Sequence, residues 1–131
     1  MSETNQTILM VDDDEDFIWQ QRTQFEKHGF KVETAHDLPS AKALIDEITP
    51  DIAVLDMMMD ENDAGVVLAH RIKKKDPDLP VILVTAMTRE TGMVLNGDTR
   101  EDRSWLKTDK VLPKPVRFEQ LLREVQLLLK K

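Results

Sequence analysis

Residues 52–56 read Ile-Ala-Val-Leu-Asp, an uninterrupted apolar run that ends in a carboxylate. A run that is apolar throughout, rather than at every second position, is what a strand covered on both faces requires. Three further runs have the same character and also lead into polar residues, namely residues 8–11 into Asp12 and Asp13, 81–84 into Thr85, and 111–113 into Lys114. These runs predict buried strands whose carboxyl ends carry the chemically active side chains.

Helix-like segments separate the strand-like runs, and a further strand is expected at 31–35. The order of segments therefore alternates between strand and helix, which is typical of an α/β fold with a doubly wound parallel sheet of five strands and helices on both faces. Residues 87–110 are mostly polar, so we expect a short or irregular helix there, followed by a long loop. The other helices are predicted at about Glu15–His28, after Asp37 as far as Pro50, near Val66–Lys75, and at Phe118–Leu129.

Composition limits the function classes. A chain of 131 residues with 40% apolar and 33% charged residues suits one globular domain. The net charge of −7 argues against direct binding to nucleic acid or to an anionic membrane. There is no cysteine, and we find neither a signal peptide at the polar N-terminus nor an apolar stretch of membrane-spanning length. We therefore expect a cytoplasmic protein without disulfides.

The strand-end carboxylates predict a metal site. Open α/β sheets place their sites outside the carboxyl ends of the strands, so Asp12, Asp13 and Asp56 are expected to meet there. Two like charges about 4 Å apart cost on the order of 4 kcal/mol at an effective dielectric constant near 20, and a divalent cation removes that cost. Oxygen ligands without cysteine or paired histidines indicate Mg²⁺, with Mn²⁺ as the alternative.

Asp56 is a candidate nucleophile. A carboxylate attacks phosphorus when a metal and an ammonium group such as that of Lys114 absorb the charge on the equatorial oxygens, and the Thr85 hydroxyl can donate to the same group. The product is an aspartyl phosphate, which water hydrolyses. Taken singly, each residue has a structural explanation: the acidic run after the first strand suits a helix N-terminus, and Lys114 lies in a Pro-Lys-Pro turn. Together, at the ends of four predicted strands, they favour phosphoryl chemistry.

These residues resemble the receiver domain of two-component response regulators. The motifs that carry the resemblance are Ile-Leu-Met-Val-Asp-Asp-Asp at 8–14, Pro-Asp-Ile-Ala-Val-Leu-Asp-Met-Met-Met at 50–59, Thr-Ala at 85–86 and Pro-Lys-Pro at 113–115. The resemblance covers nearly the whole chain. It implies a flavodoxin-like strand order 2-1-3-4-5 and a single receiver domain over residues 1–131, with a core at about 7–130 and no output domain.

The resemblance also implies roles for the site residues. Asp56 is the expected phosphoacceptor, and Asp12 and Asp13 are expected to hold Mg²⁺ together with Asp56 and the backbone carbonyl of Met58. The phosphoryl donor would be a phosphohistidine on a sensor histidine kinase or a histidine phosphotransfer domain. Such a domain is not an enzyme for other substrates, because it catalyses only its own phosphorylation and dephosphorylation.

The remaining family positions concern the switch. The resemblance makes Thr85 the switching hydroxyl and Lys114 the partner of the phosphate, with a cis peptide between Lys114 and Pro115. Three residues before the lysine the family usually has an aromatic residue, whereas this chain has Val111. We therefore expect the usual threonine–aromatic relay to be replaced, with the signal leaving through the backbone after Thr85.

Two other departures affect the neighbouring loops. The family often has proline four residues after the phosphoacceptor and glycine eight after it, but here those positions are Asp60 and Ala64. The distance from Thr85 to Lys114 is also longer than expected for the family, and Trp105 lies in the added length.

The expected output is an interaction with another protein, which is not identified, or formation of a homodimer through the fourth helix, fifth strand and fifth helix. Two alternatives remain open. A phosphatase of the haloacid dehalogenase type needs a second aspartate two residues after the nucleophile, where this chain has Met58. A phosphate-independent interaction module is favoured by Val111 and the altered loops, and is opposed by the intact Asp56 and Lys114.

Overall fold

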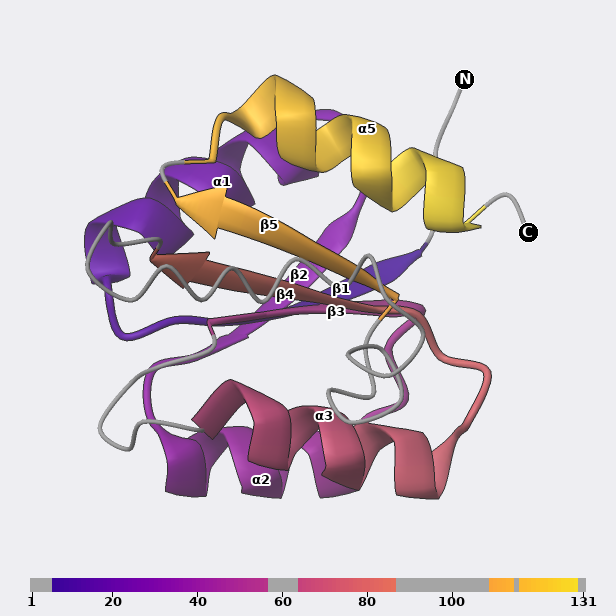
Figure 1. Cartoon of the computed structure of the whole chain (residues 1–131). Helices are drawn as coiled ribbons and strands as arrows, with labels where there is room; N and C mark the ends of the chain where they lie inside the picture. The colour runs from indigo at the N-terminus through magenta and orange to yellow at the C-terminus, as the bar shows by residue number, and fades with distance from the viewer. Residues whose placement is uncertain (1–5, 57–63, 87–108, 115, 130–131) are drawn as a thin grey trace.

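The computed structural model describes residues 6–56, 64–86, 109–114 and 116–129 (Figure 1). The strands are β1 (Thr7–Val11), β2 (Lys31–Ala35), β3 (Ile52–Asp56), β4 (Val81–Ala86) and β5 (Lys110–Lys114). The helices are α1 (Glu15–Lys27), α2 (Leu38–Glu47), α3 (Ala64–Lys75) and α5 (Phe118–Leu129). The predicted short helix between β4 and β5 lies outside the described residues, and the label α4 is not used.

The five strands form one parallel sheet in the order β2-β1-β3-β4-β5. This arrangement confirms the predicted doubly wound sheet and the order that the family resemblance implied. The register pairs Val11 with Leu55, Asp56 with Val84, and Ala86 with Lys114. The carboxyl ends of all the strands therefore lie along one edge, which the arrowheads of β4 and β5 mark on the left of Figure 1.

Helices cover both faces of the sheet. Figure 1 shows α1 and α5 above the sheet and α2 and α3 below it. The strand side chains alternate between these layers, so that in β3 Ile52 and Val54 pack on the α1/α5 side while Ala53 and Leu55 pack on the α2/α3 side. Every residue of β3 is buried, which is why its sequence shows no polar alternation.

The helix ends follow local capping chemistry. The Asp14 side chain accepts a hydrogen bond from the backbone N–H of Phe17 and caps α1, and the Asp37 side chain accepts from Ser40 and caps α2. Helix α1 ends at Lys27, one residue earlier than predicted, because the chain turns at Gly29, whose φ of 91° favours glycine. Helix α2 ends before Pro50, at Glu47, because Ile48 is already extended.

The buried faces of the helices include small and polar residues as well as large apolar ones. Helix α3 begins at Ala64, two residues before the predicted start, and Ala64 and Gly65 are both buried. Helix α1 buries a polar residue, Gln21, between Ile18 and Phe25. In α5, Leu121 and Val125 are fully buried, and four further apolar residues, Phe118, Leu122, Leu128 and Leu129, are partly buried.

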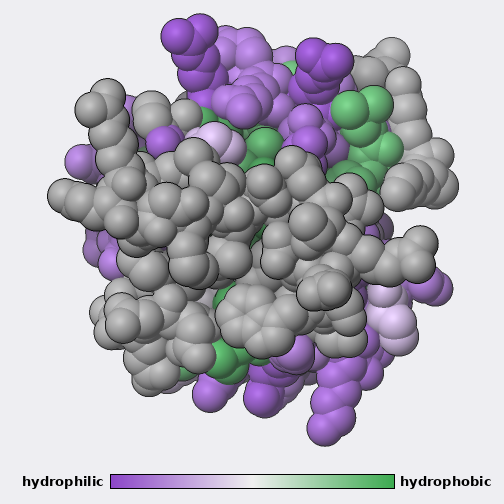
Figure 2. Space-filling model, viewed as in Figure 1, coloured by the Kyte–Doolittle hydropathy of each residue, from purple (hydrophilic) through white to green (hydrophobic). Residues whose placement is uncertain are grey.

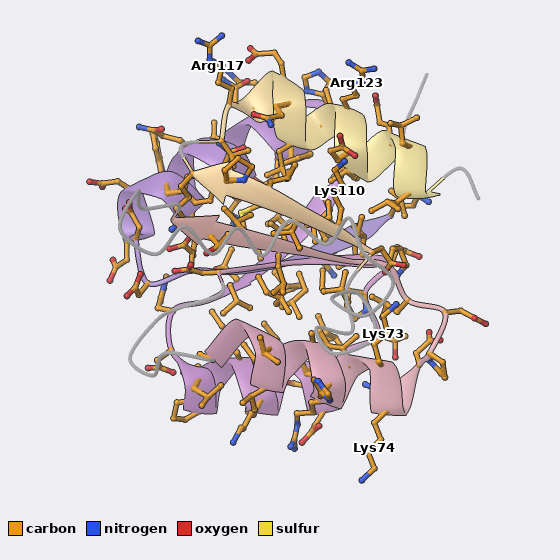
Figure 3. The ribbon with its side chains drawn as sticks, in the orientation of Figure 1. Lys73, Lys74, Lys110, Arg117 and Arg123 are labelled. Atoms are coloured by element: carbon orange, nitrogen blue, oxygen red, sulfur yellow. The ribbon has the colours of Figure 1, made fainter. Side chains whose placement is uncertain are left out.

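Asp109 fixes the point where the chain re-enters the sheet before β5. Its Oδ2 accepts hydrogen bonds from the backbone N–H of Val81 at 2.8 Å and from Lys73 Nζ at 2.9 Å. Its backbone N–H donates to the carbonyl of Val81 at 2.9 Å. Lys74, the next residue of α3, points away from the sheet (Figure 3). The start of β5 is thus tied to β4 and to the end of α3.

The helix layers present polar outer surfaces. At the top and bottom of Figure 2, over these layers, the described surface is mainly hydrophilic, with hydrophobic side chains in few places. Arg117, just before α5, and Arg123, within it, extend outward from this layer (Figure 3). Within the described part of the chain, no helix combines the length and apolarity that crossing a membrane requires.

Candidate functional site

Three polar side chains from separate strands converge at the carboxyl edge of the sheet. Asp12 follows β1, Asp56 ends β3 and Lys114 ends β5. Each lies two residues after a side chain in the α1/α5-side cluster, and because side chains alternate along a strand, all three are placed on the α1/α5 side of the sheet. Strand order and side-chain alternation together explain why residues so far apart in the sequence meet.

Lys114 bridges the two buried carboxylates. Its Nζ lies 3.1 Å from Asp12 Oδ2 and 3.5 Å from Asp56 Oδ2, so the lysine reaches across β4 to both inner strands. The Asp12 and Asp56 side chains are only 2% and 6% exposed, whereas the Lys114 side chain is 27% exposed. The Lys114 ammonium thus supplies charge compensation to two carboxylates that are held almost out of water.

Asp13 joins this pair to form an acidic cluster. One carboxylate oxygen from each of Asp12, Asp13 and Asp56 lies within 4.8 Å of the others. Asp13 is exposed, so the cluster opens to solvent on its side. Hard oxygen ligands at this spacing suit Mg²⁺, which is commonly held by one or two carboxylates together with water and phosphate oxygens. The donor set and its open side therefore fit the cation that the sequence predicted.

Hydrogen bonds within the loop after β1 hold the cluster in place. The backbone N–H of Asp14 donates to Asp12 Oδ1 at 2.9 Å, and the backbone N–H of Phe17 donates to Asp14 Oδ1 at 3.1 Å. The Asp12 N–H donates to the carbonyl of Ala35 at 3.2 Å and extends the β1–β2 ladder by one bond. The acidic run is thus both a helix start and part of the site, so the two interpretations of its sequence are compatible.

Thr85 also lies at the carboxyl edge of the sheet, and alternation along β4 assigns it to the α2/α3 side. It follows Val84, the parallel partner of Asp56, and is half-buried. Alternation places it on the side of β4 that carries Leu83, which packs in the α2/α3-side cluster. Val111 is half-buried and packs against that same cluster. The structure therefore brings Asp12, Asp13, Asp56 and Lys114 together, and Thr85 lies at the same edge, one residue after the strand partner of Asp56.

Two expected features of the site lie outside the described residues. Met58, whose carbonyl the family resemblance assigns to the metal, is one of them. The other is the peptide bond between Lys114 and Pro115, because Pro115 is not described. Asp60, Met87 and Trp105 also belong to segments that the structure does not describe.

Sequence reasoning missed an aromatic neighbour of the lysine. Lys114 Nζ lies over the ring of Phe17, 5.7 Å from its centroid. Phe17 belongs to α1, and the structure leaves it half-buried beside the site. Its position four residues after Asp13, within the first turn of α1, is the signal that could have placed it here.

The carboxylates determine the charge state of Lys114. Burial lowers the pKa of the Lys114 ammonium, but the charges of Asp12 and then Asp56, with the hydrogen bonds to both, outweigh burial. The pKa is therefore raised above its ordinary value, and the side chain is an ammonium at neutral pH. The site thus holds a permanent cation next to Asp56.

Replacing Lys114 with Met is expected to lower the free energy of unfolding of the metal-free protein by about 2–3 kcal/mol, because the Asp12 and Asp56 carboxylates lose their compensating charge. Since the folded-state pKa of Lys114 is raised, its contribution is complete below the unfolded pKa of about 10.4 and is lost as pH rises through the folded value. Urea unfolding in EDTA from pH 7 to 11 measures both effects.

The control for this measurement is Lys110→Met, which removes a lysine from the same strand whose Nζ lies 4.0 Å from Glu124. This exposed pair is expected to contribute less than about 1 kcal/mol. Equal stability of the wild type and Lys114→Met at pH 8 in EDTA would contradict the proposed charge compensation.

Comparisons with known proteins agree with this geometry. The model of the family described as the response regulator receiver domain matches residues 8–126. The response regulator MprA of Mycobacterium avium is 33% identical over 124 residues, which are 95% of this chain and 51% of MprA. The chain spans about half the length of the curated relatives that it matches.

Solved structures of response regulators are also similar to this chain. The receiver domain of the Francisella response regulator 1452 is 30% identical, with a TM-score of 0.75 over 96% of this chain and 98% of that one. The response regulator TrrA of Thermotoga maritima, solved in a complex with Mg²⁺ and BeF, is 23% identical with a TM-score of 0.74, over 94% of this chain and 98% of TrrA. The similarity to TrrA is evidence for the fold alone.

Proposed function

The chain belongs to the response regulator receiver domain family, and from this premise we propose that it is a switch controlled by phosphorylation of Asp56 in a two-component phosphorelay. One observation carries the proposal: a lysine ammonium lies 3.1 Å and 3.5 Å from two almost fully buried carboxylates, within a cluster of three acidic groups. Receiver domains are signalling switches rather than enzymes for other substrates.

The reaction that suits this site is phosphoryl transfer from a phosphohistidine. A carboxylate oxygen of Asp56 attacks phosphorus, the P–O bond forms as the P–N bond breaks, and the electron pair of that bond returns to the imidazole nitrogen. The donor is a sensor histidine kinase or a histidine phosphotransfer domain, the kind of partner that the family implies. Water later cleaves the aspartyl phosphate and restores the carboxylate.

The surrounding residues then have separate tasks. Asp12 and Asp13, with Asp56 and the carbonyl of Met58, are proposed to hold Mg²⁺, which neutralises charge on the phosphoryl oxygens when bound. The Lys114 ammonium pairs with another of those oxygens, since it already lies 3.5 Å from Asp56. The Thr85 hydroxyl is proposed to donate to the phosphoryl group and so to move the backbone that follows β4.

The altered surface is proposed to include β5, α5 and the segment between β4 and β5, and to bind a downstream protein or a second copy of the chain. The phosphoryl group adds about two negative charges and three strong acceptors at the strand ends. Lys110 of β5 lies 4.0 Å from Glu124 of α5, so these two elements are electrostatically linked. We propose that residues 1–131 form one receiver domain, with a core at about 7–130, that acts in the cytoplasm.

The test is incubation of the chain with Mg²⁺ and acetyl phosphate, followed by intact mass spectrometry. We expect the mass to increase by one phosphoryl group, and hydroxylamine to remove that group, because it attacks acyl phosphates and spares phosphate esters of serine or threonine. A protein that gains no mass supports the phosphate-independent module instead. Sustained release of phosphate from phosphate esters supports a hydrolase of the haloacid dehalogenase type.

A further inference from the structure

The charged atom of Lys114 has an aromatic neighbour in addition to its two carboxylates. The Phe17 ring centroid lies 5.7 Å from Lys114 Nζ. The face of a phenyl ring attracts a cation through its quadrupole, and this attraction grows as water is excluded. Because the Lys114 side chain is 27% exposed and Phe17 is half-buried, the contact is partly shielded from solvent.

The position of Phe17 depends on the acidic loop. The backbone N–H of Phe17 donates a hydrogen bond to Asp14 Oδ1 at 3.1 Å. The backbone N–H of Asp14 donates in turn to Asp12 Oδ1 at 2.9 Å. Phe17 therefore lies in a helix turn that hydrogen bonds connect to Asp12, one of the proposed metal ligands. The ring therefore belongs to the helix turn that directly follows the loop of the site.

Binding of a cation changes what holds the lysine. The shorter of the two ion pairs of Lys114 is the one with Asp12, at 3.1 Å. A divalent ion on Asp12 and Asp13 neutralises that carboxylate and repels the ammonium. The Phe17 ring has no ligand oxygen and does not compete for the metal, so its attraction for the ammonium persists.

We propose, on the basis of the proposed function, that Phe17 is a positioning residue for Lys114. Its ring retains the ammonium beside the acceptor oxygens of Asp56 when Mg²⁺ occupies the acidic cluster. Phe17 does not touch the reacting atoms and acts only through the lysine. With Mg²⁺ bound, the Phe17 ring thus keeps the Lys114 ammonium in the position that Asp12 gives it when no metal is bound.

The test compares the rate of labelling by acetyl phosphate at saturating Mg²⁺. Phe17→Leu keeps an apolar side chain but loses the ring face, and is expected to be labelled about 3- to 10-fold more slowly. Phe17→Tyr keeps the ring and is expected to stay within about twofold of the wild type. Phe118→Leu is the matched control, because Phe118 is also half-buried on the α1/α5 side but packs against Phe25 at 4.9 Å between centroids.

A double-mutant cycle separates positioning from a purely structural effect. In a Lys114→Met background the ring has no ammonium to hold, so Phe17→Leu is expected to cause no further slowing. In addition, NMR spectra of the Mg²⁺-loaded, unphosphorylated wild type are expected to show upfield ring-current shifts of the Lys114 ε-methylene protons, and these shifts are lost in Phe17→Leu. Both readouts address the contact itself rather than the integrity of the fold.

The outcomes distinguish this inference from the proposed function. Normal labelling of the wild type and of Phe17→Leu, or equal slowing by Phe17→Leu with and without Lys114, overturns the positioning role and leaves the phosphoacceptor role intact. Absence of the ring-current shift in the Mg²⁺-loaded wild type overturns it as well. A wild type that takes up no phosphoryl group overturns the proposed function and, with it, the inference.

Discussion

Replacing Asp56 with Asn is expected to abolish labelling by acetyl phosphate, with a loss in rate of at least about a thousandfold, equivalent to about 4 kcal/mol of activation free energy. An amide oxygen is a poor nucleophile toward phosphorus and cannot form the acyl phosphate. The amide has nearly the shape of the carboxylate, and the side chain it replaces is 6% exposed, so the change tests chemistry more than packing. Intact mass spectrometry over a time course measures the loss.

Asp16→Asn is the matched control for this substitution, because Asp16 is an exposed acid in the first turn of α1 and does not belong to the acidic cluster. It is expected to be labelled like the wild type. Urea unfolding of the Asp56→Asn variant in EDTA should show a folded protein, since Lys114 keeps Asp12 as a partner at 3.1 Å. Labelling of a folded Asp56→Asn variant at the rate of the wild type would place the acceptor at another residue.

Removal of Mg²⁺ is expected to slow labelling by at least about 100-fold, because the equatorial phosphoryl charge loses its main source of neutralisation. Chelation with EDTA tests this directly, and Mn²⁺ is expected to restore the reaction because it also prefers oxygen ligands. Asp13→Asn is expected to raise the Mg²⁺ concentration for half-maximal labelling by at least about tenfold, or about 1.4 kcal/mol. The substitution removes a charge from the exposed side of the cluster, and Asp12 and Asp56 retain Lys114.

The Asp16→Asn variant again serves as the control, since it removes one negative charge from the same loop region without removing a member of the cluster. Its Mg²⁺ requirement should match that of the wild type. If the EDTA-treated wild type is labelled as fast as the Mg²⁺-loaded protein, the acidic cluster has a purely structural role.

The sequence predicted the sheet well because the signal there is local. The inner strands β1, β3 and β4 each contain a short, continuous apolar run, and a strand buried on both faces requires that pattern whatever its neighbours are. The strand order could not be predicted in this way, because the residues within one run do not indicate which other runs it pairs with. The expected order came from the family resemblance. The convergence of Asp12, Asp56 and Lys114 followed from the parallel topology, which places the carboxyl ends of all strands at one edge.

The details that the sequence did not provide depend on how the helices pack. Burial of Gln21 and the place of Phe17 beside Lys114 are set by the rotation of α1 about its axis, which a helix with few apolar residues leaves open. The start of α3 at Ala64 was missed because small residues carry little hydrophobic signal, although their size lets the helix lie close to the sheet.

The anchoring of Asp109 affects how this fold tolerates insertions. The Asp109 carboxylate accepts hydrogen bonds from Lys73, near the end of α3, and from Val81, the first residue of β4, and its backbone N–H donates to the Val81 carbonyl. These contacts determine where β5 begins. The position at which β5 enters the sheet is therefore set by contacts with β4 and α3. A peptide epitope or a small sensor module grafted before this junction is expected to leave the lysine strand in register with β4, because the contacts of Asp109 are retained.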